Sequence, residues 1–304
     1  MHQPLSPTAA RAARFAFAAL IVSNIFLAMG PWMVRETDVG PVAAGFWRLA
    51  LAIPLLLLFA AKGSKGAIRP SAGIAMMIVV GGLFFAADLA AWHYGIVRTK
   101  LANATLFGNC SSFIFALYGF VLMRRLPGKV QAGALLLAVV GGGLLLGTSY
   151  ELSPENLEGD LFALLAGLFY FFYLIAVDRA RQTLAPMPVL ALATVAGTLP
   201  LLGFALLLGE QVMPGDWAPL ILLSLGSQVI GQGLLVYAMG YLSPVVIGLG
   251  LLTQPAVTAL VGWLAYDERL GLADAAGALM ICAALVLIRL PERRELATAR
   301  GEDH

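Results

Sequence analysis

The sequence is poor in charged residues. Asp, Glu, Lys and Arg make up only 12% of the 304 residues, whereas 60% are hydrophobic. A soluble domain of ordinary composition has roughly 25% charged and roughly 45–50% apolar residues. One water-exposed domain could not bury this much apolar surface. The shortage of charge therefore excludes a soluble globular protein and predicts a protein embedded in a lipid bilayer.

Cysteine and histidine are scarce as well. Both cysteines, Cys110 and Cys282, lie inside apolar runs, and His93 is the one histidine of three that lies within such a run. A disulfide framework or a metal cluster needs more of these side chains at defined spacings. The sequence also has no Gly-Lys-Ser type phosphate-binding loop, which argues against ATP as an energy source. We expect no metal, no cofactor and no nucleic-acid partner.

Apolar stretches of about 20 residues, the length that crosses about 30 Å of hydrocarbon, recur along the chain. They predict an all-α membrane protein of ten transmembrane helices. The expected spans are Arg14–Val34, Pro41–Ala61, Ala72–Val97, Leu101–Met123, Val130–Thr148, Gly159–Val177, Met187–Gly209, Trp217–Tyr241, Pro244–Tyr266 and Gly271–Leu290. The first span exceeds the roughly 7–15 apolar residues of a cleaved signal peptide, so we expect it to be retained.

Basic residues fall mostly on one side of these spans. That side holds Arg11, Arg14, Lys62, Lys65, Arg69, Arg124, Arg125, Lys129, Arg179, Arg181, Arg289, Arg293, Arg294 and Arg300, while the opposite side holds only Arg35, Arg98, Lys100 and Arg269. Positive loops face the cytoplasm. The pattern predicts a multi-pass protein of the bacterial inner membrane with both termini in the cytoplasm.

The two halves of the chain resemble each other. Residues 132–138 read AGALLLA and residues 276–282 read AGALMIC. Five spans per half is an odd number, so the second half must enter the membrane in the opposite orientation, as in many secondary transporters. The expected organisation is a cytoplasmic segment at 1–13, a first repeat at 14–148, an extracytoplasmic loop at 149–158, a second, inverted repeat at 159–290 and a cytoplasmic tail at 291–304.

Short motifs carry a family resemblance over nearly the whole chain. They are Ser23-Asn24, Pro41 with Arg48, Leu242-Ser243, Gln254-Pro255 and Asp267-Glu268-Arg269-Leu270. With the five-plus-five spacing, they resemble the EamA-type exporters of the drug/metabolite transporter superfamily. The cluster Trp92-His93-Tyr94 and the aromatic run 169–173 are similar to the aromatic amino-acid exporter (YddG) subgroup. Ser112 and Arg125 depart from the family, which often has proline and glutamate there.

Two charged residues, Arg48 and Asp88, lie well inside the predicted helices, away from their ends. Such a residue at mid-helix costs about 2.5–3.5 kcal/mol on insertion scales, so each needs a partner, water or a function. At 1.5 Å per residue, Arg48 lies about 10 Å from one membrane boundary and Asp88 within about 6 Å of the same boundary. This similar depth predicts an ion pair between Arg48 and Asp88, either direct or shared through water. For Arg48 we favour charge neutralisation. For Asp88 a structural role and a role in binding substrate or a proton both stay open.

Further polar and aromatic side chains converge on the membrane midplane. Ser224, Gln228 and Gln232 recur at four-residue intervals on one helix face, which cannot face lipid cheaply. Hydrogen bonds between helices would explain this stripe, but polar groups at one depth on three helices favour a cavity. His93 does not share a helix face with Asp88, whereas Trp92 does. The candidate substrate-binding residues are Asn24, Asp88, Trp92, His93, Tyr170, Tyr173, Gln228, Gln232 and Gln254.

The resemblance implies a secondary transporter that exports amino acids, aromatic and other amphipathic ones, by alternating access. A multidrug or other small-metabolite exporter is the alternative within transport. An intramembrane enzyme would need a nucleophile–base pair or metal ligands at one depth, and only His93 is available as a base. We therefore expect no enzyme. The expected partners are membrane lipid and amino-acid substrates, and the protein is expected to be a monomer or a homodimer. Glycines at Gly133, Gly141, Gly142, Gly143 and Gly277 allow close helix contact, which the dimer contacts implied by the resemblance could use.

Overall fold

The fold is that of a computed structural model, which describes residues 7–63, 70–99, 101–124, 126–147, 154–254, 256–257, 271–273, 275–284 and 286–287. Within these ranges every regular element is a helix. Several sequence predictions fall outside them. These are Lys65, Arg69, Lys100, Arg125, Pro255, the motif 267–270, residues 149–153 of the loop 149–158, the ends of the ninth and tenth spans and the tail 291–304.

Six helical stretches in the described part of the chain are long and apolar enough to cross a bilayer. They are Phe15–Arg35, Pro41–Lys62, Ala72–Ile96, Leu157–Arg181, Pro186–Leu207 and Ala218–Met239. Shorter apolar helices cover Cys110–Met123, Lys129–Leu144 and Ala275–Ala284. A multi-pass membrane protein is therefore confirmed, while the count of ten spans, the inverted repeat and the side of each terminus stay predictions.

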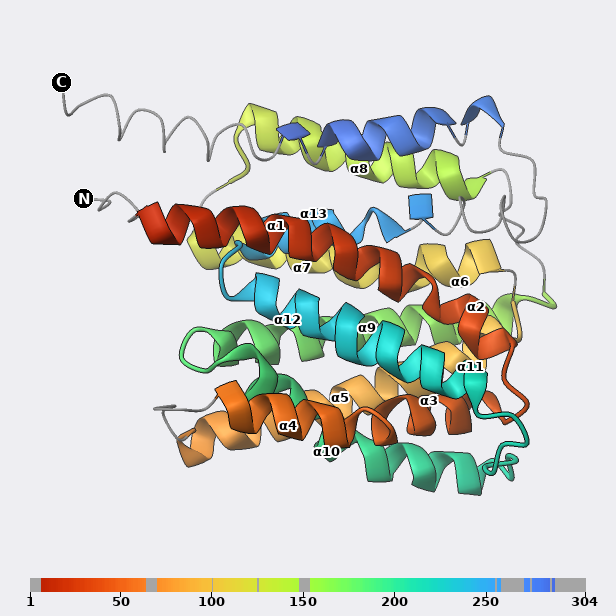
Figure 1. Cartoon of the computed structure of the whole chain (residues 1–304). Coiled ribbons are helices and arrows are strands. Elements are labelled where there is room, and N and C mark those ends of the chain that lie inside the picture. The colour runs from red at the N-terminus through yellow and green to blue at the C-terminus, as the bar shows by residue number, and fades with distance from the viewer. Residues whose placement is uncertain are drawn as a thin grey trace.

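The helices run alongside one another in layers (Figure 1). In chain order they are α1 (Pro7–Ala28), α2 (Gly30–Arg35), α3 (Pro41–Ala50), α4 (Ile53–Gly63), α5 (Ala72–Ile96), α6 (Leu101–Gly108), α7 (Cys110–Met123), α8 (Lys129–Gly147), α9 (Leu157–Arg181), α10 (Pro186–Leu207), α11 (Ala218–Leu223), η1 (Ser224–Gln232), α12 (Gly233–Met239) and α13 (Pro244–Leu251). Helix α8 and the segment 275–284 form the outermost layer on one side.

Several predicted spans are interrupted helices. The first consists of α1 and α2, which meet at Met29 just before Gly30-Pro31, and the second consists of α3 and α4, separated by Leu51 and Ala52. The eighth runs through α11, η1 and α12, with a nine-residue π-helix at its centre. Proline cannot donate a backbone hydrogen bond, which explains the break at Pro31. Such interruptions inside a bundle are tolerated where neighbouring helices or water satisfy the freed backbone groups.

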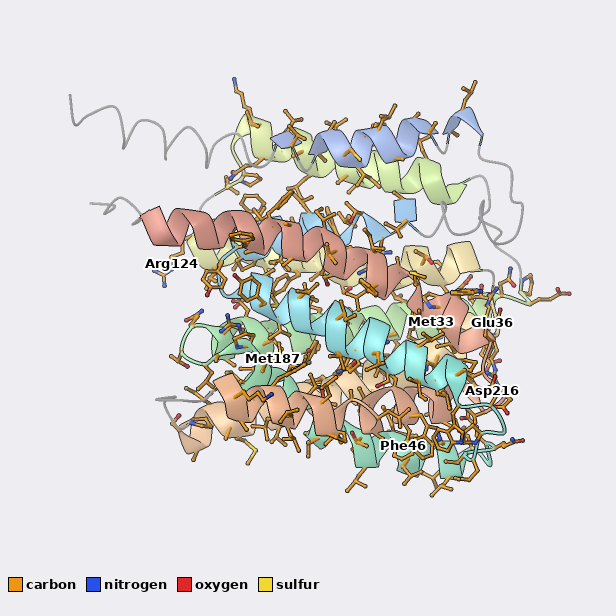
Figure 2. The ribbon with its side chains drawn as sticks, in the orientation of Figure 1. Met33, Glu36, Phe46, Arg124, Met187 and Asp216 are labelled. Atoms are coloured by element: carbon orange, nitrogen blue, oxygen red, sulfur yellow. The ribbon has the colours of Figure 1, made fainter. Side chains whose placement is uncertain are left out.

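Two ends of the bundle can be told apart in Figure 2. Glu36 and Asp216 lie at one end, which we call the Glu36 end, and Arg124 lies at the opposite end, the Arg124 end. At the Glu36 end, hydrogen bonds join two loops that are far apart in the sequence, since Asp38 accepts from the backbone of Gly215 (2.7 Å) and Asp216 (3.0 Å). Glu210 accepts from Ala43 N at the start of α3 at 2.8 Å, and a carboxylate is favourable at a helix N-terminus.

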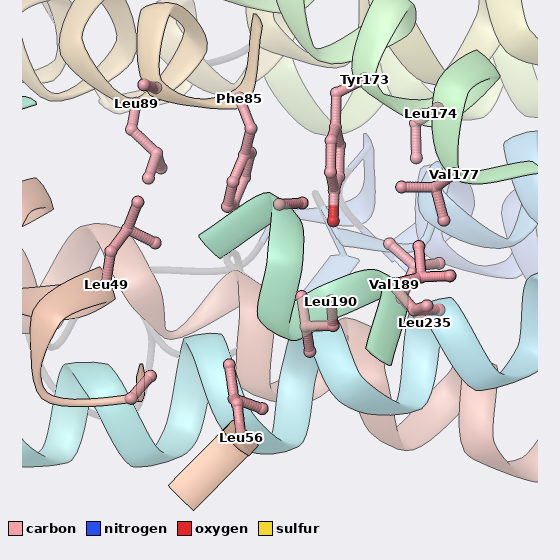
Figure 3. Close-up of a cluster of buried hydrophobic side chains, with 14 of the residues drawn as sticks. Leu49, Leu56, Phe85, Leu89, Tyr173, Leu174, Val177, Val189, Leu190 and Leu235 are labelled. Atoms are coloured by element: carbon pink, nitrogen blue, oxygen red, sulfur yellow. The ribbon is translucent and has the colours of Figure 1, made fainter. Parts of the chain in front are cut away.

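The core lies where α5, α9 and α10 pack together (Figure 3). The Phe85 and Tyr173 rings stack with centroids 4.5 Å apart, and the Tyr173 side chain is fully buried. Glycine lets α5 and α9 approach closely, because a Cβ at Gly81 would lie 2.7 Å from the Ala176 Cβ. Close contact through small residues is a common way for helices to associate in lipid, where burial of apolar surface gives little. This packing holds α5 and α9 in fixed register beside the cavity described next.

Candidate functional site

A cavity of about 90 Å³ lies between helices from both halves of the chain. Most of its walls belong to α1, α2, α3, α5, α6 and α7, and the second half adds side chains from α9, η1 and the residues after α13. The lining residues are Leu27, Ala28, Pro31, Arg48, Phe85, Asp88, Leu89, Trp92, Thr105, Gly108, Asn109, Ser111, Ser112, Tyr170, Gln232 and Gln254. The cavity therefore combines two charged groups with hydroxyls, amides and aromatic rings.

The cavity lies toward the Glu36 end of the bundle. Its α5 residues are all in the second half of that helix, and its α1 residues are in the last turn. One helical turn nearer the Arg124 end, the corresponding side chains of α1 and α9 are buried in protein contacts, as shown by Ser23, Asn24 and Tyr173. The bundle is thus packed on one side of the cavity.

Arg48 is 4% exposed and is held by a chain of side chains. Its Nε donates to Gln228 Oε1 at 3.2 Å, and Gln228 Nε2 donates to Thr194 Oγ1 at 3.0 Å. The guanidinium also lies 5.8 Å from the centre of the Phe85 ring, within range of a cation–π attraction. Gln228 therefore fixes the direction of Arg48 and does not itself line the cavity.

Asp88 lies on the face of α5 that lines the cavity and is 9% exposed. Its carboxylate accepts no hydrogen bond and makes no direct ion pair with any residue in the described ranges. The direct form of the predicted Arg48–Asp88 pair is therefore not present. The reason is that Arg48 is held by Gln228 while both charges face the void. The water-shared form stays a prediction.

Gln232 joins two tyrosines of α9. Its Nε2 donates to the Tyr170 hydroxyl at 3.2 Å, and the Tyr173 hydroxyl donates to its Oε1 at 3.4 Å. The two tyrosine rings stack with centroids 5.6 Å apart. Tyr170 and Gln232 line the cavity, whereas Tyr173 lies behind them against Phe85. The predicted aromatic site thus has one tyrosine at the cavity and one in the packed core.

Asn24 and Gln254 connect α1 to α13. Asn24 Nδ2 donates to Gly250 O at 2.7 Å, and Gln254 Nε2 lies 3.4 Å from Asn24 Oδ1. The neighbouring Ser23 hydroxyl donates to Gly231 O at 2.7 Å. Gln254 lines the cavity, but Asn24 does not. Its amide is used to join helices.

Trp92 and His93 point to different surroundings. Trp92 lines the cavity, as its shared face with Asp88 predicts. His93 is fully buried beside Pro41, whose carbonyl lies 2.8 Å from its Nδ1. A carbonyl can only accept, so Nδ1 carries the proton, and Nε2 is buried without a hydrogen-bond partner among the described residues. The structure therefore places His93 between α5 and α3, away from the cavity.

The π-helix η1 supplies both glutamines. Ser224, Ser227, Gln228 and Gln232 are all at most 1% exposed. The Ser224 and Ser227 hydroxyls are buried without a partner in the described part of the chain. π-Helical turns often occur at functional sites. Here the π-helix directs Gln228 to Arg48 and Gln232 to the α9 tyrosines.

Four polar cavity residues were missed in the sequence. Thr105, Asn109, Ser111 and Ser112 line the cavity at the junction of α6 and α7. The junction itself lies at Asn109, whose Nδ2 donates to Thr105 O at 2.7 Å. The available signal was the density of polar residues at 103–112 inside an apolar run, together with the spacing of Thr105, Asn109 and Ser112 at i, i+4 and i+7, which is one helix face.

Comparison with known proteins finds similarity to transporters. Residues 157–290 match the EamA-like transporter family. Two proteins of Archaeoglobus fulgidus, each named only as an uncharacterized transporter, are similar along most of the chain. One is 25% identical over 270 residues, covering 87% of this chain and 91% of its own length. The other is 24% identical over 279 residues, covering 91% and 97%.

A solved crystal structure has the same fold. Its TM-score is 0.75 with 17% sequence identity, and the match covers 93% of this chain and 98% of the other. At this identity the likeness concerns the fold alone. The match to the EamA-like transporter family covers the second half of the chain, residues 157–290, and the two relatives are named only as transporters. They give no substrate.

Proposed function

We propose that the protein is a secondary transporter that exports amino acids across the bacterial inner membrane. The observation that carries the proposal is one polar cavity to which both halves of the chain contribute, with two buried charges at membrane depth. Ionisable side chains inside a membrane protein mark substrate or ion pathways by default. Secondary transporters bind their substrates near the bilayer midplane between repeats.

Alternating access would come from movement of one group of helices against the other around the cavity. Interrupted helices at Met29, Leu51-Ala52 and Asn109 border or lie near it, and such points are where helices bend readily. Packing toward the Arg124 end and the void toward the Glu36 end correspond to a state with one side closed.

Aromatic amino acids are the substrates that the family resemblance implies. Trp92, Phe85 and Tyr170 give the cavity three aromatic walls, which suits an amphipathic solute. A multidrug exporter is the second candidate, favoured by the same rings together with the acidic Asp88, which would attract an organic cation. The two candidates differ in whether a carboxylate on the solute is required.

Counterflow in proteoliposomes tests the proposal. The purified protein is reconstituted, vesicles are loaded with unlabelled solute, and uptake of the labelled solute is measured for a panel of amino acids and quaternary cations. Saturable exchange of amino acids is expected. Exchange of quaternary cations alone would favour the multidrug candidate, and exchange of no solute in the panel by correctly folded protein would contradict transport of these solute classes.

A further inference from the structure

The cavity contains a positive group with unused donors. Arg48 is bound through Nε only, so both of its terminal Nη groups have no acceptor among the described residues. A guanidinium presents these donors in a planar fork that matches the two oxygens of a carboxylate. Because Gln228 is itself held by Thr194, the fork keeps one direction. Arg48 is a preorganised site for a carboxylate.

The same cavity contains a negative group with no partner. Asp88 is more than nine-tenths buried and accepts no hydrogen bond within the described ranges. Burying a carboxylate costs free energy unless a cation or a strong hydrogen-bond donor pairs with it. Arg48 and Asp88 both face the cavity without contacting each other. A molecule in the cavity would therefore supply the hydrogen-bond and ionic partners of both side chains. Water can supply these partners, but a solute that carries both charges offers an opposite charge to each side chain and is the better partner.

The volume limits that solute. A cavity of about 90 Å³ is well below the roughly 300–1,000 Å³ of drug-sized pockets. Much of the remaining wall is polar, with hydroxyls or amides from Thr105, Ser111, Ser112 and Gln232. A compact solute with few carbon atoms fits this combination, and a long side chain does not.

We propose that the cavity binds compact zwitterions, namely α-amino acids with short side chains, with the carboxylate on Arg48 and the ammonium on Asp88. The inference rests on the proposed transport function and narrows its amino-acid substrates to short side chains, in place of the aromatic amino acids that the family resemblance implies. Arg48 and Asp88 cancel each other in charge, as do the two groups of the solute. The loaded and the empty site therefore have the same net charge, which removes an electrostatic penalty from moving either state through the bilayer.

The test is counterflow of labelled glycine in proteoliposomes, with unlabelled competitors. L-Alanine and L-serine carry both charges on a short chain, ethylamine carries only the amine, and propionate carries only the carboxylate. L-Alanine and L-serine are expected to compete with glycine at concentrations roughly 10- to 100-fold lower than ethylamine or propionate, because each single-charge probe loses one charge-assisted contact. L-Phenylalanine is expected to compete more weakly than alanine because of its volume.

Substitutions test whether Arg48 binds the carboxylate and Asp88 the ammonium group of the solute. Arg48→Gln and Asp88→Asn are each expected to lower glycine exchange roughly 10- to 100-fold. Arg48→Lys keeps the charge without the fork and is expected to recover part of it. Matched controls are Arg179→Gln and Glu36→Gln, which remove an exposed charge of each sign away from the cavity. Size-exclusion profiles and thermal unfolding in detergent check that each variant is folded.

The outcomes separate this inference from the proposed function. Competition by ethylamine or propionate as strong as that by alanine would overturn the two-pole site, and this readout needs no variant. Exchange of phenylalanine or of quaternary cations without exchange of glycine would leave a transporter but overturn the compact zwitterion. Exchange of no probe at all would contradict both.

Discussion

Buried polar side chains at the cavity and one helical turn beyond it, toward the Arg124 end, differ in their hydrogen-bond partners. One helical turn from the cavity toward the Arg124 end, the polar groups of Ser23, Asn24 and Tyr173 form hydrogen bonds with neighbouring helices. Toward the Glu36 end, Asp88 and the Nη groups of Arg48 face a void without a partner in the described residues. The residue types and the depth are similar. The difference lies in whether a neighbouring helix supplies the partner.

This contrast separates polar residues that join helices from polar residues that face the cavity and are available to bind a solute. In a membrane, a polar group without a partner is costly. A group satisfied by protein should therefore contribute to stability, and a group facing the cavity should contribute to transport. The following substitutions test this division.

The largest effect on stability is expected for Tyr173→Ala. The side chain is fully buried and stacked on Phe85, so its removal leaves a cavity between α5, α9 and η1. Loss of a buried aromatic side chain costs about 3–5 kcal/mol. Thermal unfolding in detergent measures the change, and Tyr173→Phe serves as the control because it keeps the stacked ring. Equal melting temperatures of the Ala and Phe variants would refute the packed core on this side.

The next effect concerns the α5–α9 contact. Gly81→Val places atoms where the Ala176 Cβ already lies, and overpacking of a tight contact costs about 1–3 kcal/mol. Gly133→Val is the matched control, because a Cβ on that α8 glycine would meet no atom within 4 Å. We expect a lower melting temperature for the Gly81 variant and little change for the Gly133 variant. Similar behaviour of both would show that α5 and α9 do not approach as described.

A smaller loss of stability is expected for Asn24→Ala. The substitution leaves Gly250 O without its 2.7 Å hydrogen bond and costs about 1 kcal/mol. Glycine counterflow by the folded variant should stay within about twofold of that of the unsubstituted protein, because Asn24 does not line the cavity. Unchanged stability together with abolished exchange would assign Asn24 to the solute site and break the division.

The smallest effect on stability is expected for Ser112→Ala. Ser112 lines the cavity, so its hydroxyl is expected to contribute less than about 0.5 kcal/mol to folding. The expected change is instead in transport, as a KM for glycine raised roughly 5- to 10-fold by loss of one hydrogen bond. A drop in melting temperature with unaltered KM would place Ser112 among the residues that hold the bundle together.

The sequence predicted the membrane class and the candidate residues, but not their individual roles. Apolar stretches of the right length identify the helices, because the bilayer sets that length. Helical geometry separates Trp92 from His93, as the structure does. Similar depth predicted an ion pair between Arg48 and Asp88; both residues line the cavity, but the direct pair is not present among the described residues. These arguments work because they need only distances within one helix or depth across the membrane.

What could not be predicted depends on how helices are placed beside one another. The hydrogen bond from Arg48 to Gln228 depends on the register of α3 against η1, which no local pattern fixes. The four-residue spacing of Ser224, Gln228 and Gln232 predicts one face of an α-helix, whereas the structure has a π-helix in this segment. Asn24, Tyr173 and Gln228 carry the same polar groups as the cavity residues, and only tertiary packing reveals that each is bound to protein.

The most direct measurement is the reactivity of single cysteines toward water-soluble methanethiosulfonate ethylammonium, in a background with Cys110→Ala and Cys282→Ala. Ser112→Cys places a thiol in the cavity wall, and Ser23→Cys places one in the packed layer one turn from the cavity. The account predicts fast modification at position 112, slowed by saturating glycine, and no modification at position 23. Equal reactivity at both positions, or no reaction at position 112, would contradict a water-filled solute site between the two halves.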